Sequence, residues 1–117
     1  MPTLIVKKVV LVVGLNPLSP AYVSADVGGD VCPNDGYTFL HLINGSGGEL
    51  DVQIDSQVKC DQGVIDHNLS GKIAITTGQM MIGPFDKGRF NNSSGQIEIS
   101  YPSGITSLTI AAISVKP

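Results

Sequence analysis

The chain has 117 residues, of which 42% are hydrophobic and 15% are charged, and its formal net charge is −3. This length suits one folded domain with its own core, and the composition excludes an intrinsically disordered chain. Lys and Arg are scattered, and their largest cluster is the pair Lys7 and Lys8. Because nucleic-acid binding requires a row of cations that neutralise phosphates, we expect no nucleic-acid partner.

The N-terminal run LIVKKVVLVV, at 4–13, is apolar but is interrupted by two lysines. A signal peptide places its charge before an unbroken apolar stretch, and this run is too short to cross a bilayer. We therefore expect a strand or an extended arm at residues 1–20, a folded domain at 21–117 and no membrane association.

The segment GLNPLSPAY, at 14–22, contains two prolines and predicts an extended arm laid along a partner. The candidate contact residues of this arm are Leu15, Asn16, Pro17, Leu18, Pro20 and Tyr22.

Apolar and polar residues alternate with a period of two in several later segments, which is typical of strands. The predicted strands lie at 37–43, 49–55, 72–76, 96–101 and 106–115. The residues expected to point inward are Leu50, Val52, Ile54, Ile73, Ile75, Ile97, Ile99 and Tyr101. In the first segment, Tyr37, Phe39, His41 and Ile43 share one face and Leu40 and Leu42 the other. The last segment is apolar on both faces, which predicts a central strand or one covered by a partner.

Turn signals separate these runs. PNDG at 33–36 predicts a turn that leads into a strand, and NGSGG at 44–48 predicts a hairpin loop. NNSSG at 91–95 and YPSG at 101–104 end or connect strands in the same way.

The segment QMMIGPFDKGRF, at 79–90, holds two of the three phenylalanines. QMMI predicts a short strand that Gly83 and Pro84 end, since Pro lacks the N–H that a central ladder needs. We expect Phe85 to enter the core, DKG to turn the chain and Phe90 to anchor its return.

Several short strands with no sustained helical period predict an all-β protein. The expected architecture is a single antiparallel β-sandwich, or jelly-roll-like, domain with an extended N-terminal arm. Long apolar runs at 4–13 and 105–115 are difficult to bury within one small sandwich, which favours a homo-oligomer or docking on a larger assembly.

The catalytic inventory is poor, and we expect neither an enzyme nor a cofactor. His41 lies in mid-strand, where a lone histidine is more often packed and hydrogen-bonded than catalytic. His67 lies near Cys60, Asp61 and Asp66, but their spacing matches no zinc pattern, so we expect no metal. Free thiols are favoured over a bridge between Cys32 and Cys60.

Three segments together resemble a known family. DGYTFLHLINGSGGELDVQI at 35–54 resembles the DG-x-T-F-L-x-x-x-N-G opening of small structural proteins of tailed-bacteriophage virions. CDQGVIDHN at 60–68 resembles the variable loop that follows. MIGPFDKGRFNNSSGQIEISYPSGITSLTIAAI at 81–113 is similar to their IGPF, FN and C-terminal strand pattern.

The resemblance implies a non-enzymatic β-sandwich that decorates, or cements, the outer surface of a phage capsid. The implied partner is the major capsid protein, and the implied state is a homo-oligomer, with a trimer favoured over a dimer. Such a protein is made in the host cytoplasm and resides on the capsid exterior of the virion. The matching motif residues, expected to determine the fold, are Gly36, Phe39, Leu40, Asn44, Gly45, Gly83, Pro84, Phe85 and Phe90.

Two other functions stay open at this point. One is a head–tail connector or a tail-tube-associated virion protein. The other is a carbohydrate-binding or cell-surface-binding module, which sandwiches often host. The absence of Trp and the presence of only three Tyr disfavour the latter, because sugars commonly stack on exposed aromatic rings.

Overall fold

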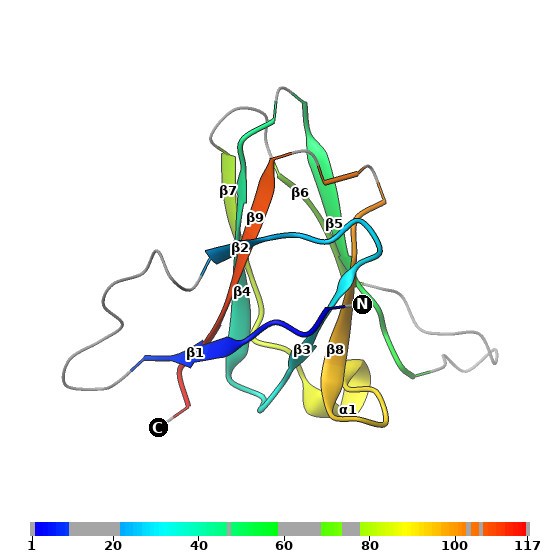
Figure 1. Ribbon diagram of the computed structural model, residues 1–117. Coiled ribbons are helices and arrows are strands. Elements are labelled where there is room, and N and C mark those ends of the chain that lie inside the picture. The colour runs from blue at the N-terminus through cyan, green and yellow to red at the C-terminus, as the bar shows by residue number, and fades with distance from the viewer. Residues whose placement is uncertain are drawn as a thin grey trace.

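The computed structural model describes residues 2–9, 22–46, 48–58, 69–73, 78–102, 104–105 and 107–116. In this part of the chain the strands are β1 (Val6–Lys8), β2 (Tyr22–Ser24), β3 (Asp30–Pro33), β4 (Thr38–Asn44), β5 (Leu50–Ile54), β6 (Leu69–Ile73), β7 (Gly78–Ile82), β8 (Gln96–Ser100) and β9 (Leu108–Ser114). The described helix is the single turn α1 (Lys87–Phe90). The strands form two sheets that pack face to face (Figure 1), which confirms the prediction of an all-β protein.

The first sheet has the order β1-β9-β4-β7, and β2 also pairs with β9. On one side of β9, β4 runs antiparallel along its whole length. On the other side, β2 pairs antiparallel with residues 109–111 and β1 pairs parallel with residues 112–114. β9 is therefore a central strand, which agrees with the prediction from its apolar sequence.

The second sheet has the order β3-β8-β5-β6, and all its pairs are antiparallel. Its inward positions are buried, as the alternation predicted, at Leu50, Val52, Ile54, Ile73, Ile97, Ile99 and Tyr101. Ile75, which was also predicted to point inward, lies outside the described residues. Of the strand expected at 72–76, residues 72 and 73 belong to β6 (Leu69–Ile73), and residues 74–76 lie outside the described residues.

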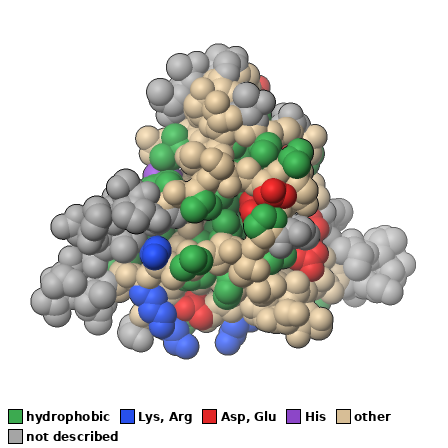
Figure 2. Space-filling model, in the orientation of Figure 1, with side chains coloured by type: hydrophobic (Ala, Val, Ile, Leu, Met, Phe, Trp, Pro, Cys, Tyr) green, Lys and Arg blue, Asp and Glu red, His purple; other side chains and the backbone are tan. Residues whose placement is uncertain are grey.

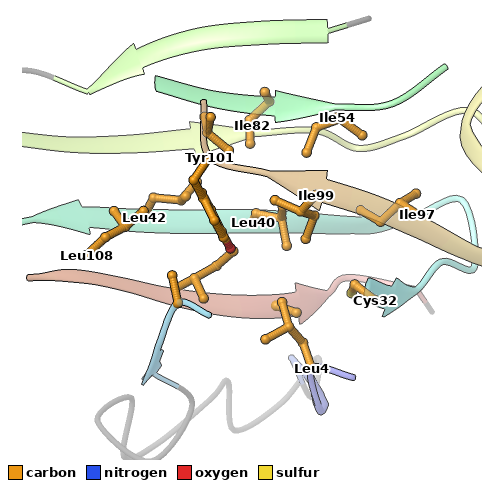
Figure 3. Close-up of a cluster of buried hydrophobic side chains, with 14 of the residues drawn as sticks. Leu4, Cys32, Leu40, Leu42, Ile54, Ile82, Ile97, Ile99, Tyr101 and Leu108 are labelled. Atoms are coloured by element: carbon orange, nitrogen blue, oxygen red, sulfur yellow. The ribbon is translucent and has the colours of Figure 1, made fainter. Parts of the chain in front are cut away.

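The core lies between the two sheets. Leu40 and Leu42 of β4 face Ile97 and Ile99 of β8 across the gap (Figure 3), and all four side chains are inaccessible to solvent. Burying each such side chain contributes about 1.5–3 kcal/mol relative to leaving it exposed. The alternation in these strands therefore determines which face of each sheet turns inward.

The corner at residues 79–90 is built as the sequence suggested, with one difference. β7 ends at Ile82, and the Gly83–Pro84 peptide bond that follows is cis. Phe85 and Phe90 are buried in the core, with their rings edge to face and their centroids 6.0 Å apart. Between them the chain forms α1, in which the N–H of Phe90 donates to the carbonyl of Asp86, where we had expected a simple turn.

The loop at 44–48 corrects a prediction. It is not a hairpin loop, because β4 lies in the first sheet and β5 in the second. The Asn44 side chain is fully buried and donates to the carbonyls of Gly48 (2.9 Å) and Ile73 (3.2 Å), and Ile73 belongs to the second sheet. These hydrogen bonds hold the connection as it crosses between the sheets, which glycine-rich composition alone does not specify.

The N-terminal residues 2–9 are part of the sandwich. The N–H of Leu4 donates to the carbonyl of Val31 in β3, whereas β1 pairs with β9 in the other sheet. Leu4 itself is buried in the core. This segment therefore crosses from one sheet to the other along the side of the molecule that faces the viewer in Figure 1.

Candidate interaction surface

The outer face of the first sheet carries several apolar side chains. Cross-strand register places Phe39 of β4 opposite Ile113 of β9, and His41 opposite both Ala111 and Met81. Tyr22 of β2 pairs with Ala111 from the other side. We define the outer apolar face as the side chains of Tyr22, Phe39, His41, Met81, Ala111 and Ile113.

This outer apolar face carries a second hydrophobic cluster, separate from the core. Ala111 and Ile113 are buried on it, and Val9, Tyr22 and Phe39 pack against them. Met81 is 64% exposed, and Tyr37 and Val115 at the margin are also exposed. Apolar side chains that pack together on the outside of a sheet, with large ones still in solvent, are typical of an interaction surface.

His41 lies at the centre of the outer apolar face and is held by its neighbours. Its Nδ1 shares a hydrogen bond with the Tyr22 hydroxyl, and its Nε2 lies 3.0 Å from Oε1 of Gln79. The Tyr22 and His41 rings also meet edge to face, with centroids 5.5 Å apart. Both ring nitrogens are occupied, so the prediction of a packed and hydrogen-bonded histidine is confirmed.

The outer face of the second sheet provides the contrast. The outward positions of β5 and β8 carry Asp51, Gln53, Gln96, Glu98 and Ser100, all partly exposed. This is the ordinary alternation of an antiparallel sheet with one solvated face. The two sheets therefore share one core but present chemically opposite outer faces.

Metal-binding side chains are not grouped in the part of the chain that the structure describes. The described residues contain no group of three or more His, Cys, Asp and Glu side chains that could hold a metal ion. His67, Cys60, Asp61 and Asp66 lie outside them. No helix within the described ranges is long and apolar enough to cross a membrane.

Cys32 is a free, buried thiol. Burial, with a smaller contribution from the charge of Asp35, raises the pKa of Cys32 to about 12. Because the thiolate is the nucleophilic form, this environment is the reverse of the one that activates a cysteine.

The predicted motif residues are placed in three regions. Leu40, Phe85 and Phe90 are core residues, whereas Phe39 lies on the outer apolar face. In the third region, Asn44 is the last residue of β4, and the remaining motif residues lie in loops and turns: Gly36, Gly45, Gly83 and Pro84. Of the predicted arm contacts, Tyr22 lies on the outer apolar face, and Leu15, Asn16, Pro17, Leu18 and Pro20 lie outside the described residues.

The turn at 34–37 is fixed to β9 through Asp35. Its carboxylate accepts hydrogen bonds from the Ser114 hydroxyl (2.6 Å), the Thr38 hydroxyl (2.9 Å) and the N–H of Tyr37 (2.8 Å). Burial alone would raise the pKa of Asp35, but these hydrogen bonds outweigh it and hold the pKa below its usual value.

One buried polar pair was not anticipated from the sequence. The Tyr101 hydroxyl donates to Oδ2 of Asp30 at 2.5 Å, and Asp30 is 1% exposed. Burial, the hydrogen bond to Asp30 and nearby negative charge all raise the pKa of Tyr101. Tyr101 was predicted to point inward, but an aspartate at the start of a short strand gives no signal that it will be buried.

Comparison of the chain with protein-family models, curated proteins and solved structures gives no match.

Proposed function

We propose that this protein is a structural component of a tailed-bacteriophage virion that decorates the outer surface of the capsid and cements it. The observation that carries the proposal is the outer apolar face of the first sheet. A packed aromatic and aliphatic surface on the outside of a sheet is suited to binding another protein.

The chemical identity of this face supports a protein partner. Tyr, Phe and Met are enriched at protein interfaces, and charged residues are depleted at their centres. The packed cluster on this face includes Tyr22, Phe39, Ala111 and Ile113, and none of these carries a charge. A ligand of the expanded shell that binds through such a surface stabilises that shell relative to other states, and many copies add avidity.

Strand pairing supports a jelly roll as the finer description of the fold. The pairs β2 with β9, β3 with β8, β4 with β7 and β5 with β6 are all antiparallel and are nested in sequence. Nested pairing of eight strands is what results when a long hairpin is rolled into two four-stranded sheets. Jelly rolls of this kind occur in viral capsid and lectin domains, so the fold is compatible with the proposal without specifying it.

The proposed arm contacts are refined by this geometry. Tyr22, at the end of the predicted arm segment, lies on the outer apolar face, so contacts of residues 15–20 and of this face would be continuous at Tyr22. Residues 2–9 are part of the sandwich, so a deletion of residues 1–20 could abolish capsid binding simply because the protein no longer folds. Replacing only residues 11–20 by a Gly/Ser linker is the appropriate test of the arm.

The proposal is tested by mixing the purified protein with expanded empty shells of the phage that encodes it and sedimenting the shells. We expect saturable binding at many copies per shell, in a homo-oligomeric form for which a trimer is favoured over a dimer. Ring formation by the free protein, or binding at a few copies per particle, would favour the connector or tail alternative. Binding to glycans with no binding to shells would favour the carbohydrate module.

A further inference from the structure

A cavity of about 460 Å³ opens on the side of the sandwich, away from the outer apolar face. Two segments border it, the N-terminal residues 2–5 and the residues that follow β2. Both cross from one sheet to the other on the side of the sandwich that faces the viewer in Figure 1. Its apolar wall includes Leu4, Ala25, Ile110 and Ala112. In the space-filling view hydrophobic side chains are grouped at the centre of this side, with acidic side chains among them (Figure 2).

The polar part of the cavity is acidic. Asp26 and Asp30 line it. Lys7 also borders it, but Lys7 pairs with Ile113, so its side chain is directed to the outer apolar face and not into the cavity. The volume lies within the usual range for small-molecule sites, which bury an apolar body and fix it with a few polar groups.

One carboxylate oxygen of Asp30, Oδ1, accepts no hydrogen bond from the described residues. Its other oxygen, Oδ2, accepts two hydrogen bonds, one from the Tyr101 hydroxyl (2.5 Å) and one from the N–H of Asp26 (3.2 Å). No described residue donates to Oδ1, although the Asp30 side chain is almost completely buried. Asp30 lines the cavity, so a donor that enters the cavity can pair with this oxygen.

We propose that this cavity receives a lysine side chain of a partner protein. The aliphatic stem of lysine matches the wall of Leu4, Ala25 and Ile110, and its ammonium supplies donors to Oδ1 of Asp30 and to Asp26. Charge complementarity selects a cation, and a single free oxygen suits the compact ammonium better than a guanidinium, whose planar fork requires two.

The assignment of this lysine to a capsid protein rests on the proposed function. The recognition of a lysine side chain by the cavity does not depend on that function. A titration with a small lysine derivative therefore tests the cavity, whereas shell sedimentation tests the function. Either result can fail while the other succeeds.

The experiment is an amide NMR titration of the full chain, at low ionic strength because salt screens the charges. The probe is lysine blocked as its N-acetyl and N-methylamide derivative, and the matched control is the same derivative of norleucine, which keeps the stem and lacks the ammonium. We expect shift changes confined to the cavity, at amides such as those of Leu4, Ala25 and Ala112, and binding of the lysine derivative at least about tenfold tighter than that of norleucine.

Variants of the two acidic residues sharpen the test. Asp30→Asn preserves an acceptor for Tyr101 but removes the charge, and it should weaken lysine binding about tenfold, the equivalent of about 1.4 kcal/mol. If Asp30→Asn does not fold, Asp26→Asn serves in its place, with a several-fold loss expected.

The proposal would be overturned by no measurable binding of the lysine derivative or by equal affinity for norleucine. Shift changes centred elsewhere on the molecule, or an affinity that the removal of an acidic charge leaves unchanged, would overturn it equally.

Discussion

At the residue scale, Gly83 shows how one backbone position fixes the corner after β7. Its φ is 122°, a conformation that L side chains rarely adopt, and an added Cβ would lie 3.0 Å from both Cα and Cβ of Phe39. Phe85 lies beside the same site, with a ring carbon 3.1 Å from the position of that Cβ. Glycine is required here for two separate reasons, conformation and space.

Gly95 is a matched control for Gly83, because its φ is also positive (74°) but no atom lies within 4 Å of an added Cβ. We expect Gly95→Ala to lower the free energy of unfolding by about 1–2 kcal/mol, from backbone strain alone. Gly83→Ala should cost at least about 1 kcal/mol more, because overpacking adds to the strain. Urea unfolding of both variants measures the difference, and equal losses would show that the close approach to Phe39 is irrelevant.

Cys32 gives a prediction for alkaline pH. Its pKa is raised from the ordinary value of 9.0 to about 12 in the folded state, chiefly by burial. The folded protein therefore holds the thiol proton more tightly than the unfolded chain, so this contribution to stability is complete below pH 9 and is lost as the pH rises toward 12. Between these values the free energy of unfolding should fall by about 1.4 kcal/mol per pH unit from this group.

The measurement is urea unfolding at pH values from 8 to 11 for the original chain and for Cys32→Ala. The variant should be less stable at pH 8, because it loses buried volume, yet its stability should decline less steeply above pH 9. Tyr101, whose pKa is also raised, accounts for part of the remaining slope. Parallel pH profiles for the two proteins would contradict the assignment to Cys32.

At the element scale, the strands that alternation predicted are those whose inward faces meet across the core. Leu50, Val52 and Ile54 in β5, and Ile97 and Ile99 in β8, follow a strict period of two and are buried as expected. Alternation is a local signal, and it is sufficient to predict a strand and its inward face wherever one face is buried and the other is solvated.

The elements that were missed depend on distant partners. β3 contains four residues and is positioned by its pairing with β8, more than sixty residues later, which no local pattern reveals. The loop after Asn44 was mistaken for a hairpin for the same reason, since Asn44 donates to Ile73 in the opposite sheet. Of the candidate surface, the apolar positions of β4 and β9 were readable from sequence, whereas the contribution of Tyr22 required the β2–β9 register.

The N-terminal segment before β1 provides a prediction at this scale. Leu4 is buried in the core, whereas Ile5, its neighbour, is 75% exposed. We expect Leu4→Ala to lower the free energy of unfolding by about 2–4 kcal/mol, from lost burial and the cavity left behind, and Ile5→Ala to change it by less than about 0.5 kcal/mol. Thermal or urea unfolding compares them, and a similar effect of the two substitutions would show that residues 2–5 are not anchored in the sandwich.

At the scale of the whole molecule, the two outer faces have different chemistry. The first sheet presents Tyr22, Phe39 and Met81, and the second presents Asp51, Glu98 and other polar side chains. Exposing the polar second face to water costs little free energy, whereas removing the apolar first face from water is favourable. We therefore infer that the protein binds its partner through the first sheet and turns the acidic second sheet toward solvent.

This orientation can be tested with one substitution on each face. Met81 and Gln53 are outward residues of β7 and β5, on opposite faces of the sandwich. Met81→Lys and Gln53→Lys add the same charge at an outward position of a strand, and neither side chain belongs to the core, so we expect both variants to fold. A charge on an apolar interface should reduce affinity at least about tenfold, whereas a charge at a solvated surface should have little effect.

The most direct measurement is cryo-electron microscopy of expanded shells mixed with the original protein, with Met81→Lys and with Gln53→Lys. We predict repeated density over the outer surface of the shell for the original protein and for Gln53→Lys, with the first sheet facing the capsid, and a bare shell for Met81→Lys at the same protein concentration. Equal occupancy by both variants, or density in which the second sheet faces the capsid, would contradict the account.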